Sequence, residues 1–341
     1  MERRTLMAFK AFGKAPSGAR LARMEGSPRF HAGVFENPEP TDMRLQGASF
    51  AKVFWEFMTK TPPTPTLHAV KTDLHLLPEG QMVWFGHSGY YLNLPGLKIA
   101  VDPVLSGNAS PFRFFAKAFP GTDVYKPGDL PDLDVLVITH DHYDHLDWTT
   151  VIALNPRFIV TALGVGADLE YWGIPPEKII ELDLGESFDR IPGVRLTAAP
   201  ARHFSGRGAK RNGTLWMSIV LEINEKRVLI GGDSGYGSHF AAIGQTYGPF
   251  DLAILECGQY GVHWPFIHMF PEQTAQAARD LGARALLPVH WGKFALSMHP
   301  WDEPIRRLMA AAGGLTVATP RIGQAFPVLG PYPTEHWWEA V

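Results

Sequence analysis

Hydrophobic and polar positions follow two different patterns along the chain, and the change falls near residue 81. Beyond it, short runs of apolar and β-branched residues are separated by Gly, Pro and Asp, which is typical of β-strands. Helices are predicted between the later runs, at 149–154, 164–172, 238–247, 271–281 and 304–312. The predicted strands occupy 82–85, 90–94, 98–101, 135–139, 158–161, 194–199, 215–223, 228–230, 252–255 and 285–289. Because both halves combine strands with helices, the pattern predicts an α/β sandwich with sheets inside and helices outside.

Residues 1–80 show little periodicity and are predicted to be an N-terminal extension that packs on a core domain at 81–341. One amphipathic helix is predicted there, and the prolines at 62, 63 and 65 end it. We favour packing on the main domain for this helix; a membrane-surface element and a subunit contact stay open. Its apolar face consists of Phe50, Val53, Phe54, Phe57 and Met58.

Composition restricts the chemistry further. The 341 residues include 31 basic and 34 acidic side chains, and a net charge of −3 excludes a global basic field for nucleic acid. A single cysteine excludes an intramolecular disulfide framework and Cys-clustered zinc sites. Histidine and carboxylate remain as metal ligands. Neither a secretory signal nor an apolar run of spanning length is evident, so we expect a soluble, cytoplasmic protein, with membrane association left open.

A dense group of ligand-type residues directly follows the predicted strand at 135–139. Residues 140–145 read His-Asp-His-Tyr-Asp-His. At a strand end, His140 and His142 can face one point while Asp144 and His145 face a neighbouring one. Imidazole and carboxylate are good ligands for zinc and similar metals. Three histidines together with Asp144 within six residues therefore indicate a metal site.

Further ligand-type residues come just after other apolar runs. His203 follows 194–199, Asp233 follows 228–230, and His290 follows 285–289. Each would be a weak signal alone. Because the same pattern recurs at separate strand ends, we expect these side chains to converge at one edge of the sandwich.

The motifs together resemble a known family. Residues 140–145 carry the metal signature of the metallo-β-lactamase superfamily. The chain resembles, more narrowly, N-acyl-phosphatidylethanolamine-hydrolysing phospholipase D and its bacterial relatives, from about residue 82 to 326. The narrower likeness rests on Trp-Phe-Gly-His-Ser at 84–88, Gly-Gly-Asp-Ser-Gly-Tyr at 231–236, Tyr-Gly-Pro-Phe-Asp-Leu at 247–252, and His-Trp-Gly at 290–292.

The resemblance implies an αββα sandwich with two zinc ions at one edge, although iron or manganese could occupy such a site. One ion would be bound by His140, His142 and His203. The other would be bound by Asp144, His145 and His290, and Asp233 would bridge both. His268 matches a family histidine that lies near the metals without binding them and would hold or polarise a phosphate oxygen.

The implied activity is a zinc-dependent phosphodiesterase of phospholipase D type, acting on N-acyl phospholipids or a related phosphodiester. A metal-bridging hydroxide would attack phosphorus, and Asp144 would orient it as well as ligating metal. A metal-dependent lactonase or other ester hydrolase is the alternative enzyme. A metal-retaining binding or regulatory protein is the alternative of another class. The expected partner is a small-molecule or phospholipid substrate, and a homo-oligomer stays open.

Other residues leave two interpretations open. His87 would contribute to the surroundings of the metals or be an ordinary buried histidine, and Asp102 would satisfy a turn or orient a metal-binding histidine. The rings of Phe112, Phe114, Phe115 and Phe119 would belong to the core or form an acyl-chain groove. The basic residues near His203 would be solvated or meet an arriving phosphate; they are Arg202, Arg207, Lys210 and Arg211.

Overall fold

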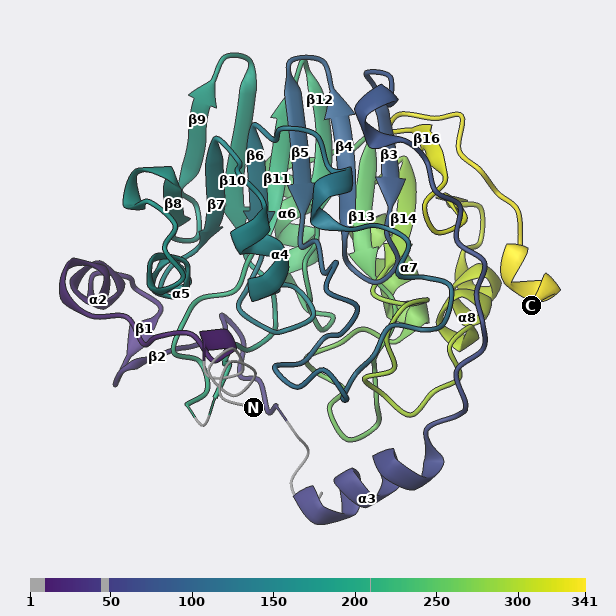
Figure 1. Ribbon diagram of the computed structural model, residues 1–341, viewed down its shortest axis with the longest axis horizontal. Helices are drawn as coiled ribbons and strands as arrows, with labels where there is room; N and C mark the ends of the chain where they lie inside the picture. The colour runs from purple at the N-terminus through teal and green to yellow at the C-terminus, as the bar shows by residue number, and fades with distance from the viewer. Residues whose placement is uncertain (1–9, 44–48, 209) are drawn as a thin grey trace.

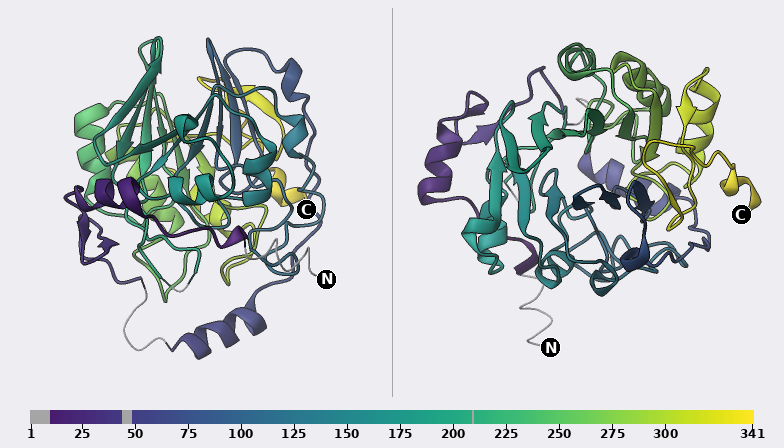
Figure 2. Two further views of the ribbon diagram at one scale, coloured as in Figure 1. Left: turned by 60° about the vertical axis from the view of Figure 1, so that its left-hand side comes forward. Right: turned by 90° about the horizontal axis from the view of Figure 1, so that it is seen from above.

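The computed structural model describes residues 10–43, 49–208 and 210–341. Within these ranges, two seven-stranded sheets pack face to face and carry helices on their outer sides (Figures 1 and 2). The facing sides share one continuous core of buried apolar side chains. The αββα sandwich predicted from the sequence is therefore confirmed.

The first sheet has the strand order β16-β3-β4-β5-β6-β7-β8. Strands β5 to β8 pair in parallel, whereas β16, β3, β4 and β5 pair antiparallel. Central strand β6 is buried along its whole length, which explains why its sequence is a continuous apolar run. In that order, the strands span Ala325–Pro327, Gln81–Trp84, Tyr90–Leu94, Leu97–Val101, Val135–Ile138, Phe158–Ala162 and Ile179–Leu182.

The second sheet repeats this plan with the order β15-β14-β13-β12-β11-β10-β9. Here β12 to β15 pair in parallel and β9 to β12 pair antiparallel. Strands β13 and β14 are buried throughout. In the order given, the strands span Thr316–Val317, Ala285–Val289, Leu252–Glu256, Lys226–Ile230, Ser218–Ile223, Val194–Ala199 and Ser187–Ile191.

Helices cover the outer faces of both sheets. In Figure 1, α4 lies in front of the sheets, while α6 and α7 lie behind them. The helices begin where the sequence provides start signals: Asp147 accepts from the N–H of Thr149 at α4, and Pro271 occupies the first position of α7. The bounds are Trp148–Ala153 for α4, Gly166–Tyr171 for α5, His239–Tyr247 for α6, Pro271–Asp280 for α7 and Glu303–Ala311 for α8. Short 3₁₀ turns occupy Leu74–Leu76, Pro127–Asp129, Pro176–Lys178 and Trp337–Ala340.

Strand direction decides where the site can form. In the first sheet β3, β5 and β6 run the same way, and in the second β10, β12, β13 and β14 do so. Their carboxyl ends therefore meet at one edge of each sheet. In open sheets, the loops beyond such ends are the usual place for binding sites.

The chain before β3 packs on this core through charged contacts. Helix α2 (Gly18–Glu25) precedes a small hairpin of β1 (Phe30–His31) and β2 (Val34–Phe35). Arg20 of α2 forms an ion pair with Glu170 at 2.9 Å and another with the buried Glu181. Glu181 in turn accepts from the N–H groups of two glycines at the start of α5.

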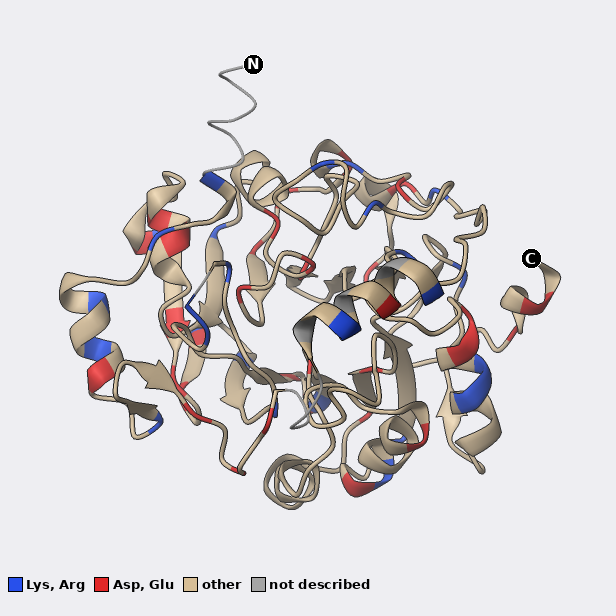
Figure 3. Ribbon diagram, turned by 90° about the horizontal axis from the view of Figure 1, so that it is seen from below, with Lys and Arg blue, Asp and Glu red and all other residues tan. Residues whose placement is uncertain are grey.

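A helix is present where the amphipathic segment predicted one. Helix α3 spans Phe50–Lys60 and lies across the edge at which the strands end (Figure 3). Glu56 contacts His263 at 3.1 Å, and the ring of Phe57 lies 6.4 Å from that of Phe115. The side chains of three predicted apolar-face residues, Phe50, Phe54 and Met58, fall outside the described part. Among the described residues, no helix is long and apolar enough to cross a membrane.

Several short elements were not predicted. Strands β8, β9, β15 and β16, the β1–β2 hairpin and helix α2 have no counterpart in the sequence pattern. Strand β9 carries Asp189 and Arg190 side by side, and β15 has only two residues. These elements exist because a neighbouring strand or ion pair holds them, and tertiary contacts of that kind leave no periodic signal.

We predict that Asp168 makes stability fall as pH rises. Its side chain is buried and accepts from the N–H of Lys14 at 2.7 Å, and burial raises its pKa to about 7. The unfolded carboxyl, with a pKa of roughly 4, releases a proton that the folded state retains. The contribution is therefore fully present below about pH 4 and is lost as pH rises through 7. Asp168→Asn, which keeps an acceptor for Lys14, should reduce this loss.

The measurement is urea unfolding of the native protein and the variant at about pH 5 and about pH 8. The difference in unfolding free energy between the two pH values should be smaller for Asp168→Asn. Asp189→Asn, at an exposed position of β9, is the control and should leave the difference unchanged. Equal pH dependence in all three proteins would contradict the prediction.

Candidate metal centre

The ligand-type residues predicted from separate parts of the chain meet at one edge of the sandwich. Each lies in a loop that follows the carboxyl end of a strand, so the shared strand direction brings them together. Asp144 and His142 are partly buried, Asp144 with 13 % side-chain exposure, and the other members of the set are buried. The set consists of His140, His142, Asp144 and His145 after β6, His203 after β10, Asp233 after β12 and His290 after β14.

One group of ligand atoms forms around His142. Its Nδ1 lies 2.9 Å from Nε2 of His140 and 3.1 Å from Nε2 of His203. Asp233 Oδ2 lies 3.8 Å from His140 Nε2 and 3.7 Å from His203 Nε2. The four ligand atoms lie within 4.8 Å of one another, so this group could hold a metal ion.

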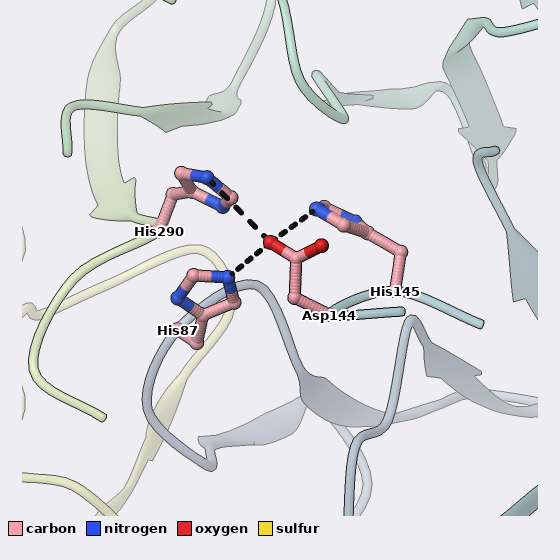
Figure 4. Close-up of side chains that lie close together, drawn as sticks. All are labelled: His87, Asp144, His145 and His290. Carbon is pink, nitrogen blue, oxygen red and sulfur yellow. Dashed lines mark hydrogen bonds and ion pairs between the residues drawn. The ribbon is translucent and has the colours of Figure 1, made fainter. Parts of the chain in front are cut away.

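A second group forms around Asp144 (Figure 4). Its Oδ2 lies 3.7 Å from Nε2 of His145 and 3.9 Å from Nε2 of His290. His87, which sequence analysis left between two roles, also belongs here, because its Nε2 lies 2.9 Å from the same oxygen. These four residues also could hold a metal ion.

Asp233 lies between the two groups. Besides its approach to His140 and His203, its Oδ2 lies 3.1 Å from His145 Nε2, and its Oδ1 lies 3.2 Å from His290 Nδ1. One carboxylate therefore reaches imidazoles of both groups. This is the geometry expected of a ligand that bridges two neighbouring ions.

Hydrogen bonds on the far side of the rings orient three of the histidines. His145 Nδ1 lies 2.7 Å from Asp102 Oδ2, and His203 Nδ1 lies 2.8 Å from the carbonyl oxygen of Ile267. His140 Nδ1 lies 3.0 Å from the Thr139 hydroxyl, which itself donates to Asp102. A ring that donates from Nδ1 presents a lone pair at Nε2, so these partners point the coordinating atom into the site. Of its two open roles, Asp102 thus has that of orienting a histidine.

Burial keeps most of these imidazoles uncharged. It lowers the pKa of His142 to about 3 and holds three others well below the ordinary histidine value. Neutral rings have the free lone pair that metal binding requires. The three others are His140, His203 and His290.

His145 is the exception. Burial opposes its protonation, but the carboxylates of Asp233, Asp144 and Asp102 together hold its pKa well above the ordinary value. Burial also raises the pKa of Asp233 to about 6. Crowded carboxylates in a buried site need a compensating positive charge.

The residues present fit a bound divalent metal. Four buried polar atoms within the groups have no hydrogen-bond partner among the described residues: His87 Nδ1, His142 Nε2, His145 Nε2 and Asp233 Oδ1. Leaving such atoms unpaired costs roughly 1–3 kcal/mol each. The donor set is all imidazole nitrogen and carboxylate oxygen, which suits zinc, iron or manganese.

His268 lies beside the groups. Its ring centre is 5.0 Å from that of His203 and 5.1 Å from that of His290. Its Nδ1 lies 3.1 Å from Oε2 of Glu256, the last residue of β13, which sequence analysis did not identify. Glu256 is fully buried. Its position directly after the apolar strand at 252–255 is the sequence feature that could have identified it as a residue near the site.

A cavity of about 1,020 Å³ opens on this edge. Asp144, Asp233, His268 and His290 line it together with Arg211 and apolar side chains. The apolar part of its wall includes Phe12, Phe204, Trp264, Ile267 and Leu296. The ligand-type residues therefore face a space large enough for a sizeable substrate with an apolar portion.

Of the four basic residues near His203, Lys210 is exposed, and the three arginines have different roles. Arg207 is buried and donates to the carbonyl oxygens of Asp141, Leu146 and Ala11 at 2.7–2.8 Å, so it holds both ends of the 142–145 turn. Arg202 donates to the carbonyl oxygens of Tyr236 and Pro40 and to the hydroxyl of Thr41. Neither is free for a ligand. Arg207 and Arg211 both line the cavity, but the N–H groups of Arg207 are taken up by backbone carbonyl oxygens, so Arg211 is the better placed of the two to meet a ligand.

The phenylalanine loop differs from both expected arrangements. Phe119 is buried, but Phe112, Phe114 and Phe115 are 45 %, 78 % and 42 % exposed and do not line the cavity. Phe112 instead packs edge-on against Phe12, which does line it, with ring centres 6.1 Å apart. These rings are surface features beside the cavity.

Known proteins resemble this chain over most of its length. The family model for the β-lactamase superfamily domain matches residues 98–291. An uncharacterised protein of Mycobacterium tuberculosis is 39 % identical over 339 residues, covering 95 % of this chain and 91 % of the relative. The N-acyl-phosphatidylethanolamine-hydrolyzing phospholipase D 1 of Caenorhabditis elegans is 32 % identical over 259 residues, covering 67 % of this chain and 69 % of the relative.

A solved structure shares the fold. A metallo hydrolase from the hyperthermophilic archaeon Ignicoccus hospitalis superposes with a TM-score of 0.54 at 22 % identity, covering 72 % of this chain and 96 % of that chain. At this identity the similarity concerns the architecture alone. It agrees with the two packed sheets described above.

We predict that Asp102→Asn weakens metal binding. The residue has φ = 41°, a left-handed conformation that Asn tolerates well, so the backbone should be kept. The charged acceptor for His145 is lost, and outer partners of this kind typically contribute about 10–100-fold to metal affinity. Zinc affinity of the purified variant, measured by competition with a chromophoric chelator, should fall by that order.

Asp134→Asn is the matched control, because Asp134 accepts from the N–H of Lys98 at the opposite end of the same strands. Its zinc affinity should equal that of the native protein. Unchanged affinity in Asp102→Asn as well would show that the His145 contact has no influence on the metals.

Proposed function

The chain belongs to the metallo-β-lactamase superfamily of metal-dependent hydrolases, and from that premise we propose that it is a binuclear zinc phosphodiesterase of phospholipase D type. Its substrate would be an N-acyl phospholipid or a related phosphodiester. The observation that carries this proposal is that Asp233 joins two His/Asp groups in the wall of a large cavity that also holds His268 and Arg211.

In this proposal His140, His142 and His203 would hold one ion, and Asp144, His145 and His290 would hold the other. Asp233 would be shared by both. Two bound divalent ions would lower the pKa of a shared water and offset the charge that develops on phosphate. Asp144 faces the cavity, so its carboxylate can orient the attacking water. His87 holds Asp144 in that position through its contact of 2.9 Å.

His268 would bind a phosphate oxygen. Burial raises the pKa of Glu256 well above its ordinary value, which favours the protonated carboxyl, a form that can donate to His268 Nδ1. Burial also lowers the pKa of His268, which keeps the ring neutral. The ring proton then sits on Nε2, where it can be donated to the substrate. Arg211 adds a cation on the same cavity wall.

A lipid substrate is favoured by the apolar surroundings. Phe12, Trp264 and Leu296 can hold an acyl chain within the cavity. Outside it, Phe112, Phe114 and Phe115 expose aromatic rings that would contact the apolar part of a lipid, and Trp55 of α3 is 69 % exposed. We therefore propose that the substrate enters from a lipid surface on this side.

The apolar cavity wall would also accept an acyl lactone, which is the second candidate. We predict that the zinc-loaded protein hydrolyses bis-p-nitrophenyl phosphate and an N-acyl phosphatidylethanolamine, with phosphatidic acid and the released N-acylethanolamine detected by mass spectrometry. A homoserine lactone is tested in parallel. Turnover of the lactone alone would reject the phosphodiesterase, and turnover of none would favour a binding protein.

We further predict that His268→Ala lowers kcat by about 100-fold, the usual loss when a donor to a developing negative charge is removed. Its metal content, measured by inductively coupled plasma mass spectrometry, should stay at two ions per chain. His263→Ala is the control, because His263 lies on the same loop but contacts Glu56 of α3. Loss of about half the metal in His268→Ala would instead make His268 a ligand.

A further inference from the structure

A segment that precedes the sandwich in the chain crosses the loops that carry two of the ligand-type residues. Residues 37–41, here called the crossing segment, follow strand β2 and run beside the loops after β10 and β12. Phe35, immediately before it, is completely buried, and its N–H donates to the carbonyl oxygen of Asn212 at 2.8 Å. The crossing segment therefore starts from a fixed point.

Asn37 binds the backbone of His203 on both sides. Its Nδ2 donates to the carbonyl oxygen of His203 at 2.7 Å, and its Oδ1 accepts from the N–H of His203 at 3.1 Å. The same Oδ1 accepts from the indole of Trp216 at 3.1 Å. A loop residue has no strand partner for these two backbone groups, so the Asn37 amide takes the place that a neighbouring strand would have.

Two further residues of the crossing segment hold the adjoining loops. Glu39 accepts from the N–H of Ser238 at 2.9 Å and from its hydroxyl, at the start of α6. Thr41 accepts from Nε of Arg202 at 2.9 Å. The backbone N–H of Arg202 donates to the hydroxyl of Ser234, next to Asp233, at 2.9 Å. The loops of His203 and Asp233 are thus tied to the same five residues.

We propose that Asn37 is a positioning residue for His203. The proposal rests on the assignment of His203 as a metal ligand, but it does not depend on which substrate is cleaved. Two hydrogen bonds fix the backbone of His203, and the contact of Nδ1 with the Ile267 carbonyl fixes its ring. With its N–H, its carbonyl oxygen and its Nδ1 all held, His203 directs its Nε2 at His142 and Asp233. Without Asn37 the two hydrogen bonds to the His203 backbone are lost, and the contact of Nδ1 with Ile267 alone must fix the position of the His203 ring.

The alternative is that Asn37 only stabilises the fold. The two roles differ in what a substitution changes. A positioning residue alters the affinity and coordination of the ion held by His203 in protein that is fully folded. A purely structural residue lowers the unfolding temperature of the metal-free protein and leaves the affinity of the folded fraction unchanged.

The experiment compares the full-length native protein with Asn37→Ala and Asn37→Ser. Zinc affinity of each of the two sites is measured by chelator competition, well below the unfolding temperature of the metal-free variants. Asn37→Ala should weaken one site by about 10–100-fold and leave the other within about twofold. Asn37→Ser, whose hydroxyl can serve only one of the two His203 groups, should lose less. The cobalt-substituted variant should show altered visible absorption from one ion only.

Two reference variants make the outcome decisive. Arg23→Ala removes an exposed ion pair between α2 and Glu186, within the same N-terminal part of the chain, and should leave both affinities unchanged. His203→Ala tests the assignment on which the proposal rests, and should nearly abolish binding at one site. If His203→Ala leaves both sites intact, the ligand assignment is wrong. If His203→Ala disrupts one site but Asn37→Ala leaves both affinities and the cobalt spectrum unchanged, the positioning role is overturned.

Discussion

The direction of the strands is the constraint on which the rest of this structure depends. In each sheet, the strands that precede site residues run the same way, with their carboxyl ends at one edge. Packing the two sheets face to face brings those edges together over a shared apolar core. Residues separated by more than a hundred positions, such as His145 and His290, then lie close enough to share one site. The rigid sheets fix the positions of the loops, and the loops carry the ligand-type side chains.

Electrostatics explains why so many titratable groups can be buried at this edge. Isolated charges in a core are costly, but here each has a defined partner. Asp102 accepts from both the backbone and the hydroxyl of Thr139 and pairs with His145, while Arg207 directs its N–H groups at backbone carbonyls. Among the described residues, His145 Nε2 and Asp233 Oδ1 have no hydrogen-bond partner, although each lies within 3.2 Å of a ligand-type atom of another residue. Asp102 thus holds the far side of the His145 ring, while its Nε2 stays available to a cation.

Sequence reasoning predicted the parts of this site that follow from local pattern. The ligand-type residues could be found because each comes just after a continuous apolar run, as His140 does after β6. Asp102 remained ambiguous, because a residue before a proline has equal reason to satisfy a turn. No sequence pattern marked Asn37. Its contact with His203 joins residues that lie 166 positions apart in the sequence and exists only in the folded chain. Short elements such as α2 were missed for the same reason: the ion pair of Arg20 with Glu181 exists only after folding.

The contact between Arg207 and Ala11 has a kinetic consequence. The two residues are 196 positions apart, and the arginine also fixes the turn that carries His142 and His145. Contacts of such long range form slowly, because the entropy of closing a large loop is lost before the contact can stabilise the chain. Ala11 precedes the sandwich in the sequence, yet its carbonyl oxygen can accept from Arg207 only when the loop beyond β10 is in place. We therefore expect the contact that joins Ala11 to the histidine turn to be among the late ones in folding, because it needs the loops of both sheets.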